Sequence, residues 1–131
     1  MKIYDCFMYF DEDLVLELRL NTLDKYVDYF VIVESNYNHK GDERELRFNI
    51  DKFKKFKNKI LYLNYNFTPE GIEIISEKEN ENSQSAKFIL NAARRENGQR
   101  NYIEKGLLNA KNEDLILISD IDEIPNLSNV Q

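Results

Sequence analysis

Four short apolar runs, each bounded by polar residues, constrain the fold of this chain more than any other feature. They occupy residues 3–10, 29–34, 60–65 and 114–119. Runs of this length that are rich in β-branched and aromatic residues are typical of strands buried on both faces of a sheet. Segments with helical spacing separate them. Strands that alternate with helices predict an α/β fold with a mostly parallel sheet, whose strands end along a common edge.

The first helix is predicted directly after the first strand. Its apolar residues recur at i, i+4, i+7 and i+11, namely Leu16, Leu20, Leu23 and Val27. The alternation that runs through Leu14 and Leu18 also fits a strand, so both readings stay open here. If the segment is a helix, Asp11 or Asp13 is expected to cap it, because carboxylates are favoured at a helix start.

Two further helices are predicted later in the chain. One covers residues 51–58, with its two phenylalanines turned inward and its lysines in solvent. The other covers residues 85–110, with a break near Gly98. The polar run 76–85 lacks apolar anchors and is predicted to be an exposed loop.

Composition excludes several classes of chemistry. The 131 residues include 24 acidic and 18 basic side chains, and the net charge of −6 argues against binding to a nucleic-acid backbone. One His, one Cys and four Gly leave no Cys-rich zinc site, no His-based triad and no glycine-rich phosphate loop. Reactivity must therefore rest on carboxylates, basic side chains and amides, with or without a hard metal ion. No stretch approaches the ~20 apolar residues of a membrane span, and no signal peptide is evident, so a cytoplasmic location is expected.

An acidic motif follows the fourth strand directly and is the strongest local signal for a site. It consists of Asp120, Ile121, Asp122 and Glu123. If the backbone stays extended through Asp122, the carboxylates of Asp120 and Asp122 project on the same side at the ligand-binding edge of the sheet. Such oxygen ligands suit Mg²⁺ or Mn²⁺ together with a diphosphate. The alternative is that these acids end the strand and cap a turn before Pro125.

Polar residues on the apolar face of the third predicted helix give a second signal. Arg95, Glu96 and Gln99 fall on that face, and Arg100 falls at its border. One interpretation is a structural ion pair between Glu96 and Arg100, which are four residues apart. The other is that Arg95 or Arg100 reaches an anionic ligand.

Residues that follow the first two strands are expected at the same edge. Phe10 and Glu12 come after the first strand, and Glu34 ends the second. An aromatic ring and hydrogen-bonding groups at this place suit a nucleotide base, whereas a polar loop is the alternative. His39 is interpreted as a surface loop residue and Cys6 as an unreactive thiol in the core.

Several stretches together resemble glycosyltransferase family 17, whose members include β-1,4-mannosyl-glycoprotein β-1,4-N-acetylglucosaminyltransferases. The most specific are VDYFVIVES at residues 27–35 and SDIDEIP at residues 119–125. Weaker similarity covers residues 3–10, 17–21, 53–60 and 95–101, in the order of the family. The resemblance spans most of the chain.

The resemblance implies a GT-A-like, Rossmann-like fold and metal-dependent transfer of a sugar from a UDP-sugar, with UDP-GlcNAc as the expected donor and a glycan as acceptor. It implies that Asp122 ligates Mn²⁺ or Mg²⁺ and that Asp120 contacts the ribose or the waters of the metal. It also implies that Glu34 lies near the nucleoside. Arg100 would lie near the diphosphate or support the loop that carries the D-x-D motif.

The resemblance also bears on the extent of the domain. Residues 1–131 are expected to form one partial domain, the nucleotide-sugar-binding half, which stops just after the D-x-D strand. The catalytic base is then expected beyond Gln131 and is not identified. Two other functions stay open: a non-catalytic α/β binding module, and a phosphohydrolase that uses Asp120 as its nucleophile.

Overall fold

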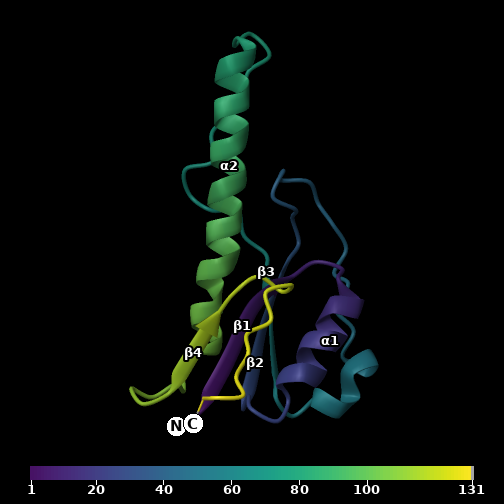
Figure 1. Cartoon of the computed structure of the whole chain (residues 1–131). Coiled ribbons are helices and arrows are strands. Elements are labelled where there is room, and N and C mark those ends of the chain that lie inside the picture. The colour runs from purple at the N-terminus through teal and green to yellow at the C-terminus, as the bar shows by residue number, and fades with distance from the viewer. Residues whose placement is uncertain (131) are drawn as a thin grey trace.

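One parallel four-stranded sheet organises the chain in the computed structural model, which describes residues 1–130 (Figure 1). Its strands are β1 (Ile3–Tyr9), β2 (Tyr29–Ser35), β3 (Ile60–Tyr65) and β4 (Leu115–Ile118). Their order across the sheet is β3-β2-β1-β4, and all three pairings are parallel. The predicted Rossmann-like α/β fold is therefore confirmed, and each apolar run of the sequence forms one of the strands.

Two α-helices and two 3₁₀ helices connect the strands. They are α1 (Asp13–Leu23), α2 (Glu81–Asn101), η1 (Ile50–Phe56) and η2 (Tyr102–Gly106). The chain steps from β1 to β2 to β3, and α2 with η2 then returns it across the sheet to β4 on the far side of β1. The strand order thus reverses between β1 and β4. In open α/β sheets, ligands bind outside the carboxyl ends of the strands at such a switch point.

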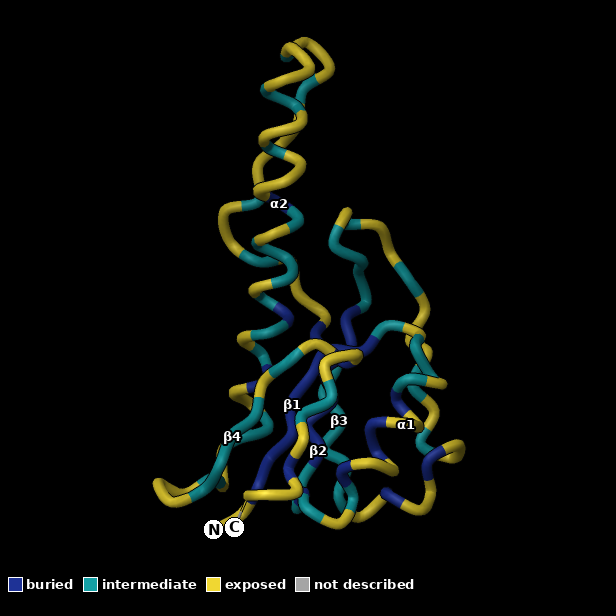
Figure 2. Tube along the Cα trace, viewed as in Figure 1, coloured by how far each residue is buried: buried dark blue, intermediate teal, exposed yellow. Residues whose placement is uncertain are grey.

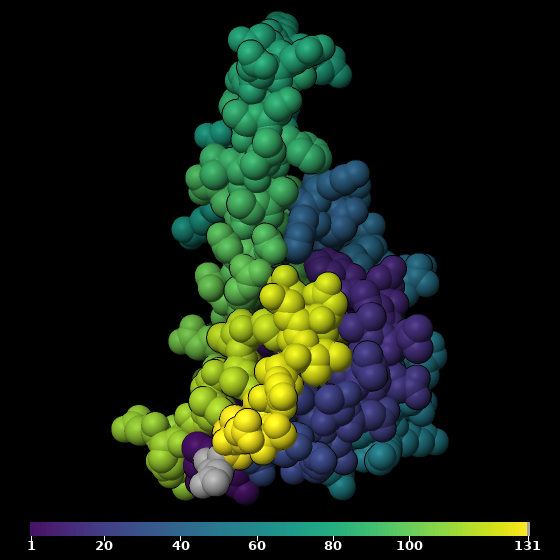
Figure 3. Space-filling view, in the orientation of Figure 1, coloured from purple at the N-terminus to yellow at the C-terminus, as the bar shows by residue number. Residues whose placement is uncertain are grey.

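The first of two cores lies between the sheet and α1. Alternate residues of β1 face this side, because successive side chains of a strand point to opposite faces. They pack against the helix through Leu16, Leu20 and Leu23, all fully buried. Ile121 and Leu127 complete this core from the C-terminal segment, which covers the surface between α2 and the N-terminal part of the chain (Figure 3).

The second core lies on the opposite face, where η2 packs. Cys6, Val31 and Val33 meet Ile103 there. Gly106 permits this close approach, since a Cβ atom at that position would lie 2.6 Å from Cγ1 of Val31. Burial raises the pKa of the Cys6 thiol to about 12. The placement of Cys6 in the core is confirmed, and its lack of reactivity stays a prediction.

The predicted starts of the first two helices need correction. Glu12 occupies the N-cap of α1 without a capping side-chain hydrogen bond, so neither Asp11 nor Asp13 caps it. Asp13 instead accepts hydrogen bonds from Tyr9 and Lys52. The second predicted helix is the 3₁₀ helix η1, with its phenylalanines buried and its lysines outward as expected.

The predicted bounds of the third helix were also wrong. α2 starts at Glu81, inside the run expected to be a loop, because the side chain of Asn80 caps it by accepting a hydrogen bond from the Ser83 amide at 2.8 Å. The helix passes through Gly98 and changes to 3₁₀ geometry at Tyr102. Its N-terminal half projects beyond the sheet (Figure 2). Phe88, in this half, is therefore 44% exposed.

Candidate active site

A pocket of about 360 Å³ lies at the switch point between β1 and β4. Residues of β1 and α1 and of the segment between them line it, together with the turn after β4, one loop residue and one residue of α2. They are Met8, Phe10, Glu12, Val15, His39, Glu96, Asp120, Ile121 and Asp122. Four of these side chains are carboxylates. The structure thus brings together Phe10, Glu12, Asp120 and Asp122, which sequence reasoning had placed at this edge from two separate parts of the chain.

The D-x-D motif itself forms a turn rather than the extended segment that was predicted. β4 ends at Ile118, and the amide of Glu123 donates a hydrogen bond to the Asp120 carbonyl at 2.9 Å. The Glu123 carboxylate accepts from the Asp120 amide at 3.0 Å and closes the turn from the other side. Ile121 is only 7% exposed and anchors the turn in the core. Both aspartates still line the pocket, and both are exposed to solvent.

Arg19 of α1 holds this turn from beneath. Its guanidinium is fully buried and forms a bidentate ion pair with Asp5 of β1, with N–O distances of 2.6 and 2.8 Å. It also donates to the carbonyl oxygens of Asp120 at 2.7 Å and of Ile121 and Glu123 at 3.1 Å each. A last bond reaches the hydroxyl of Ser119 at 2.7 Å. The strand, the helix and the acidic turn are therefore joined through one side chain.

Sequence reasoning missed Arg19, although the signal was present. Arg19 falls three residues after Leu16, on the buried face of α1, and Asp5 falls on the face of β1 that α1 covers. A charge on each of two facing apolar surfaces implies a buried pair, because an unpaired buried charge is costly.

Arg100 lies at the rim of the pocket between two carboxylates. Its Nη2 atom is 3.2 Å from Oε1 of Glu96 and 3.7 Å from Oδ1 of Asp120. The structural ion pair with Glu96 is thus present, and the same guanidinium also neighbours the D-x-D turn. The Arg100 side chain is 37% exposed, so it stays accessible from solvent.

The aromatic and acidic residues after β1 form the opposite wall. The Glu12 carboxylate accepts hydrogen bonds from the amides of Phe10 at 2.9 Å and Asp11 at 2.7 Å, which orders the short turn into α1. The Phe10 ring meets the ring of His39 edge to face, with centroids 5.1 Å apart. The guanidinium of Arg44 lies 5.5 Å from the Phe10 centroid.

Glu34 lies behind this wall and does not line the pocket. Its fully buried carboxylate accepts from the amides of Arg47 and Phe48 and from the Tyr62 hydroxyl, and it pairs with Arg44 at 3.0 Å. It therefore ties the loop after β2 to the sheet. A contact between Glu34 and a nucleoside stays a prediction.

Arg95 also lies outside the pocket lining. Its Nη1 atom donates to the His39 carbonyl at 3.5 Å. Its guanidinium packs on Gly41, where a Cβ atom would lie 2.5 Å from Nη2. Gly41 has a φ of +94°, a conformation that favours glycine. Arg95 thus holds the loop that carries His39, and a direct contact with the donor stays a prediction.

Sequence reasoning missed the contact between His39, which lines the pocket, and Gln99, which lies on α2. His39 was interpreted as a surface loop residue, but its ring lines the pocket and lies 3.3 Å from Oε1 of Gln99. Gln99, on α2, is 1% exposed and donates to the Val33 carbonyl at 3.1 Å. Only the polarity of Gln99 within an apolar helix face hinted at a partner.

The donor set suits a hard cation, although the protein supplies few ligands at any one point. Within residues 1–130 no three His, Cys, Asp or Glu side chains are grouped closely enough to hold a metal ion by themselves. The carboxylates of the pocket are the oxygen ligands that Mg²⁺ and Mn²⁺ prefer. Such ions commonly take one or two carboxylates and complete their shell with water and phosphate oxygens. The residues therefore fit a metal that is bound jointly with a phosphorylated ligand.

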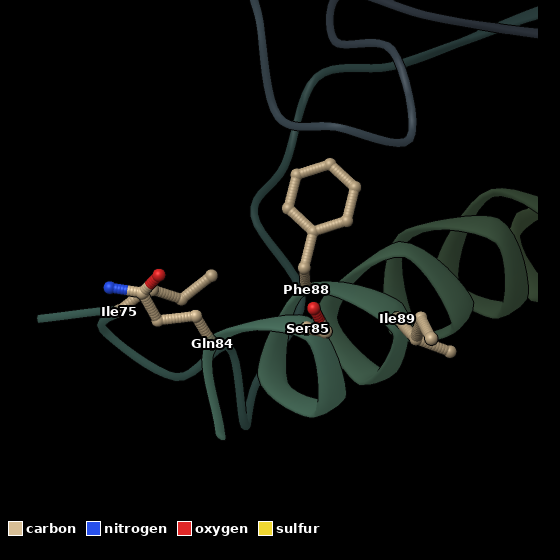
Figure 4. A pocket seen from close by; sticks show the side chains of 5 residues that line it. All are labelled: Ile75, Gln84, Ser85, Phe88 and Ile89. Atoms are coloured by element: carbon tan, nitrogen blue, oxygen red, sulfur yellow. The ribbon is translucent and has the colours of Figure 1, made fainter. Parts of the chain in front are cut away.

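A larger hollow of about 420 Å³ lies near the start of α2, away from the strand ends. Ile75, Gln84, Ser85, Phe88 and Ile89 line it, and Phe88 and Ile89 project from the helix in different directions (Figure 4). None of these side chains is charged. The hollow therefore offers no group for acid–base or metal chemistry.

A Rossmann-like sheet with an acidic turn at its switch point is an arrangement in which a ligand binds outside the carboxyl ends of the strands. Comparison with protein families gives the assignment: the model of glycosyltransferase family 17 matches residues 1–131, and the chain belongs to that family. The comparisons with curated proteins and with solved structures find no match. The chain is thus a glycosyltransferase by family, and a sugar donor and an acceptor are its partners. Within residues 1–130 no helix is long and apolar enough to cross a membrane.

Proposed function

We propose that this chain binds a UDP-sugar, with UDP-GlcNAc as the donor, in the pocket between β1 and β4, and that the sugar is transferred to a glycan. The observation that carries the proposal is the meeting of the D-x-D turn with Phe10 and Glu12 in one pocket of about 360 Å³. That volume falls within the range of small-ligand sites.

We assign roles to the two aspartates of the turn from their surroundings. Asp122 has an exposed side chain and is our proposed metal ligand, with Asp120 beside it on the same turn. Mn²⁺ or Mg²⁺ bound there would act as a Lewis acid toward the diphosphate leaving group. Asp120 lies 3.7 Å from Arg100, which orients this carboxylate and adds a positive charge at the rim. Arg100 is therefore proposed to stabilise the diphosphate as its negative charge develops.

The buried residues beneath the turn support it rigidly. Arg19 holds the turn through the carbonyl oxygens of Asp120, Ile121 and Glu123, which restrains the backbone that carries the two aspartates. Pre-organised groups need no reorganisation when the ligand binds. The competing phosphohydrolase hypothesis has no support from the family comparison.

The test is thermal unfolding of the 131-residue chain with UDP, with and without Mn²⁺. We expect UDP to raise the melting temperature only when Mn²⁺ is present, because the two ligands share the site. Asp122→Asn should abolish the Mn²⁺-dependent shift at an unchanged starting melting temperature. Glu113→Gln, an exposed acid in the turn before β4, is the matched control and should behave as wild type. A UDP-induced shift that survives both removal of Mn²⁺ and Asp122→Asn would refute the metal-dependent site.

A further inference from the structure

His39 is the one imidazole of the chain, and the structure fixes it in the wall of the pocket. It lies in the loop after β2, where Tyr37 pairs with Glu43 in an antiparallel bridge and Gly41 turns the chain. Arg95 binds the His39 carbonyl, and the Phe10 ring meets the imidazole edge to face at 5.1 Å. The ring is therefore held by a loop, a helix and the residue that follows β1.

The hydrogen bonds around Gln99 determine which ring nitrogen carries the proton. The Val33 carbonyl can only accept, so the amide nitrogen of Gln99 must face it, at 3.1 Å. The amide oxygen of Gln99 then faces Nε2 of His39 at 3.3 Å, and that oxygen can only accept. Nε2 of His39 must therefore carry the hydrogen. Gln99 is 1% exposed, so water does not offer it other partners.

A neutral imidazole with hydrogen on Nε2 has an unprotonated Nδ1, which accepts hydrogen bonds. Within residues 1–130 no other hydrogen bond reaches the His39 ring. Nδ1 is thus the ring nitrogen left for a ligand. The other polar side chains of the lining are the carboxylates of Glu12, Glu96, Asp120 and Asp122, which also accept. A wall made of acceptors selects ligand groups that donate, and sugar hydroxyls are such groups.

We infer that Nδ1 of His39 accepts a hydrogen bond from a sugar hydroxyl of the donor, either on the ribose or on the transferred sugar. The inference rests on the proposed UDP-sugar site and adds a contact residue to it. Gln99 is the positioning residue, because it fixes the tautomer and the orientation of the ring without facing the ligand.

Two substitutions separate the two ring nitrogens. His39→Gln places an amide near the position of Nε2, which keeps a donor for Gln99 and removes the acceptor at Nδ1. His39→Asn places an amide near Nδ1 and gives up the contact with Gln99. Binding is measured by calorimetry with Mn²⁺ and four probes: UDP, its 2′-deoxy and 3′-deoxy analogues, and UDP-GlcNAc. Melting temperatures of both variants establish that they are folded.

We expect His39→Gln to weaken binding about threefold to tenfold, the effect of one lost hydrogen bond. His39→Asn should stay within about threefold of wild type. A loss shared by UDP and UDP-GlcNAc, and reduced for one deoxy analogue, identifies the ribose hydroxyl that is bound. A loss confined to UDP-GlcNAc identifies the transferred sugar.

Three results would overturn the inference. One is unchanged binding of every probe by folded His39→Gln, and another is an equal loss in both variants. The third is an equal loss for UDP and both deoxy analogues, which would mean that the contact is not with a hydroxyl. If wild-type protein binds none of the probes, the proposed function fails as well, so the two failures are distinguishable.

Discussion

Replacing Arg19 by Met should remove much of the stability of this chain. The guanidinium is fully buried, pairs with Asp5 through two contacts and donates to three backbone carbonyls. Methionine fills a similar space without a charge or a donor. Removing one partner of a buried ion pair costs about 3–5 kcal/mol, because the other charge is left uncompensated. The total free energy of unfolding of a domain is about 5–15 kcal/mol. The substitution therefore removes at least about a fifth of the free energy of unfolding, and most of it if the domain lies at the low end of that range.

Urea unfolding followed by far-UV circular dichroism measures this loss, since the chain contains no Trp for fluorescence. With an m-value of about 1.5 kcal/mol/M, the midpoint should fall by about 2–3 M. Arg47→Met is the matched control. Arg47 is exposed, so its replacement should change the free energy of unfolding by less than about 0.5 kcal/mol.

A double-mutant cycle tests the reasoning behind the number. Asp5→Asn should cost nearly as much as Arg19→Met, and the double variant should cost about 1–3 kcal/mol less than the sum of the two. Strict additivity would show that the pair does not act as a unit. A midpoint within about 0.3 M of wild type for Arg19→Met would refute the argument altogether.

Two further predictions concern ionisable groups, namely Cys6 in the second core and Asp13 at the start of α1. Cys6 should react with a thiol reagent at pH 8 only after unfolding. Burial raises its pKa to about 12, so roughly one Cys6 side chain in ten thousand is a thiolate at that pH. Rapid labelling of the folded protein would contradict this prediction. Although burial opposes it, hydrogen bonds from Tyr9 and Lys52 lower the pKa of the Asp13 carboxyl. A lowered pKa stabilises the fold above about pH 4, and this contribution is lost as the pH falls further. Asp13→Asn should therefore destabilise by up to about 1 kcal/mol at pH 7, and a difference that persists undiminished in urea titrations at pH 3 would contradict the assignment.

The strands were predictable because each one is a local pattern. An apolar run that is buried on both faces needs no knowledge of its neighbours, so β3 occupies the run predicted for it, residues 60–65, and the others differ only at their ends. The start of α2 was not predictable in this way. The helix begins in a polar segment that projects into solvent, so no apolar stripe marks it. Only Asn80, a favourable cap, signalled the start.

The features of the candidate site likewise separate into those set by local sequence and those set by distant residues. Asp120 and Asp122 were found because they follow a strand, and position along the sequence was enough to place them at the carboxyl edge. The turn that they form was not found, because its shape depends on residues that are distant in sequence. Ile121 is drawn into the core, and Arg19 lies about a hundred residues earlier in the chain. His39 was missed for the same reason, since its partner Gln99 is sixty residues away.

The number of N–H groups on Arg19 explains why the acidic turn and the sheet are ordered together. A guanidinium has five N–H groups. Asp5 accepts from Nε and Nη2, and Ser119 takes a second bond from Nη2, which leaves both hydrogens of Nη1. A fully buried side chain cannot direct them to water, so they need carbonyls that belong to neither a helix nor a sheet ladder. The segment after β4 supplies three such carbonyls, and it can do so only if it turns at Asp120 instead of continuing as a strand. The buried charge on α1 thus determines the conformation in which Asp120 and Asp122 are presented to a ligand.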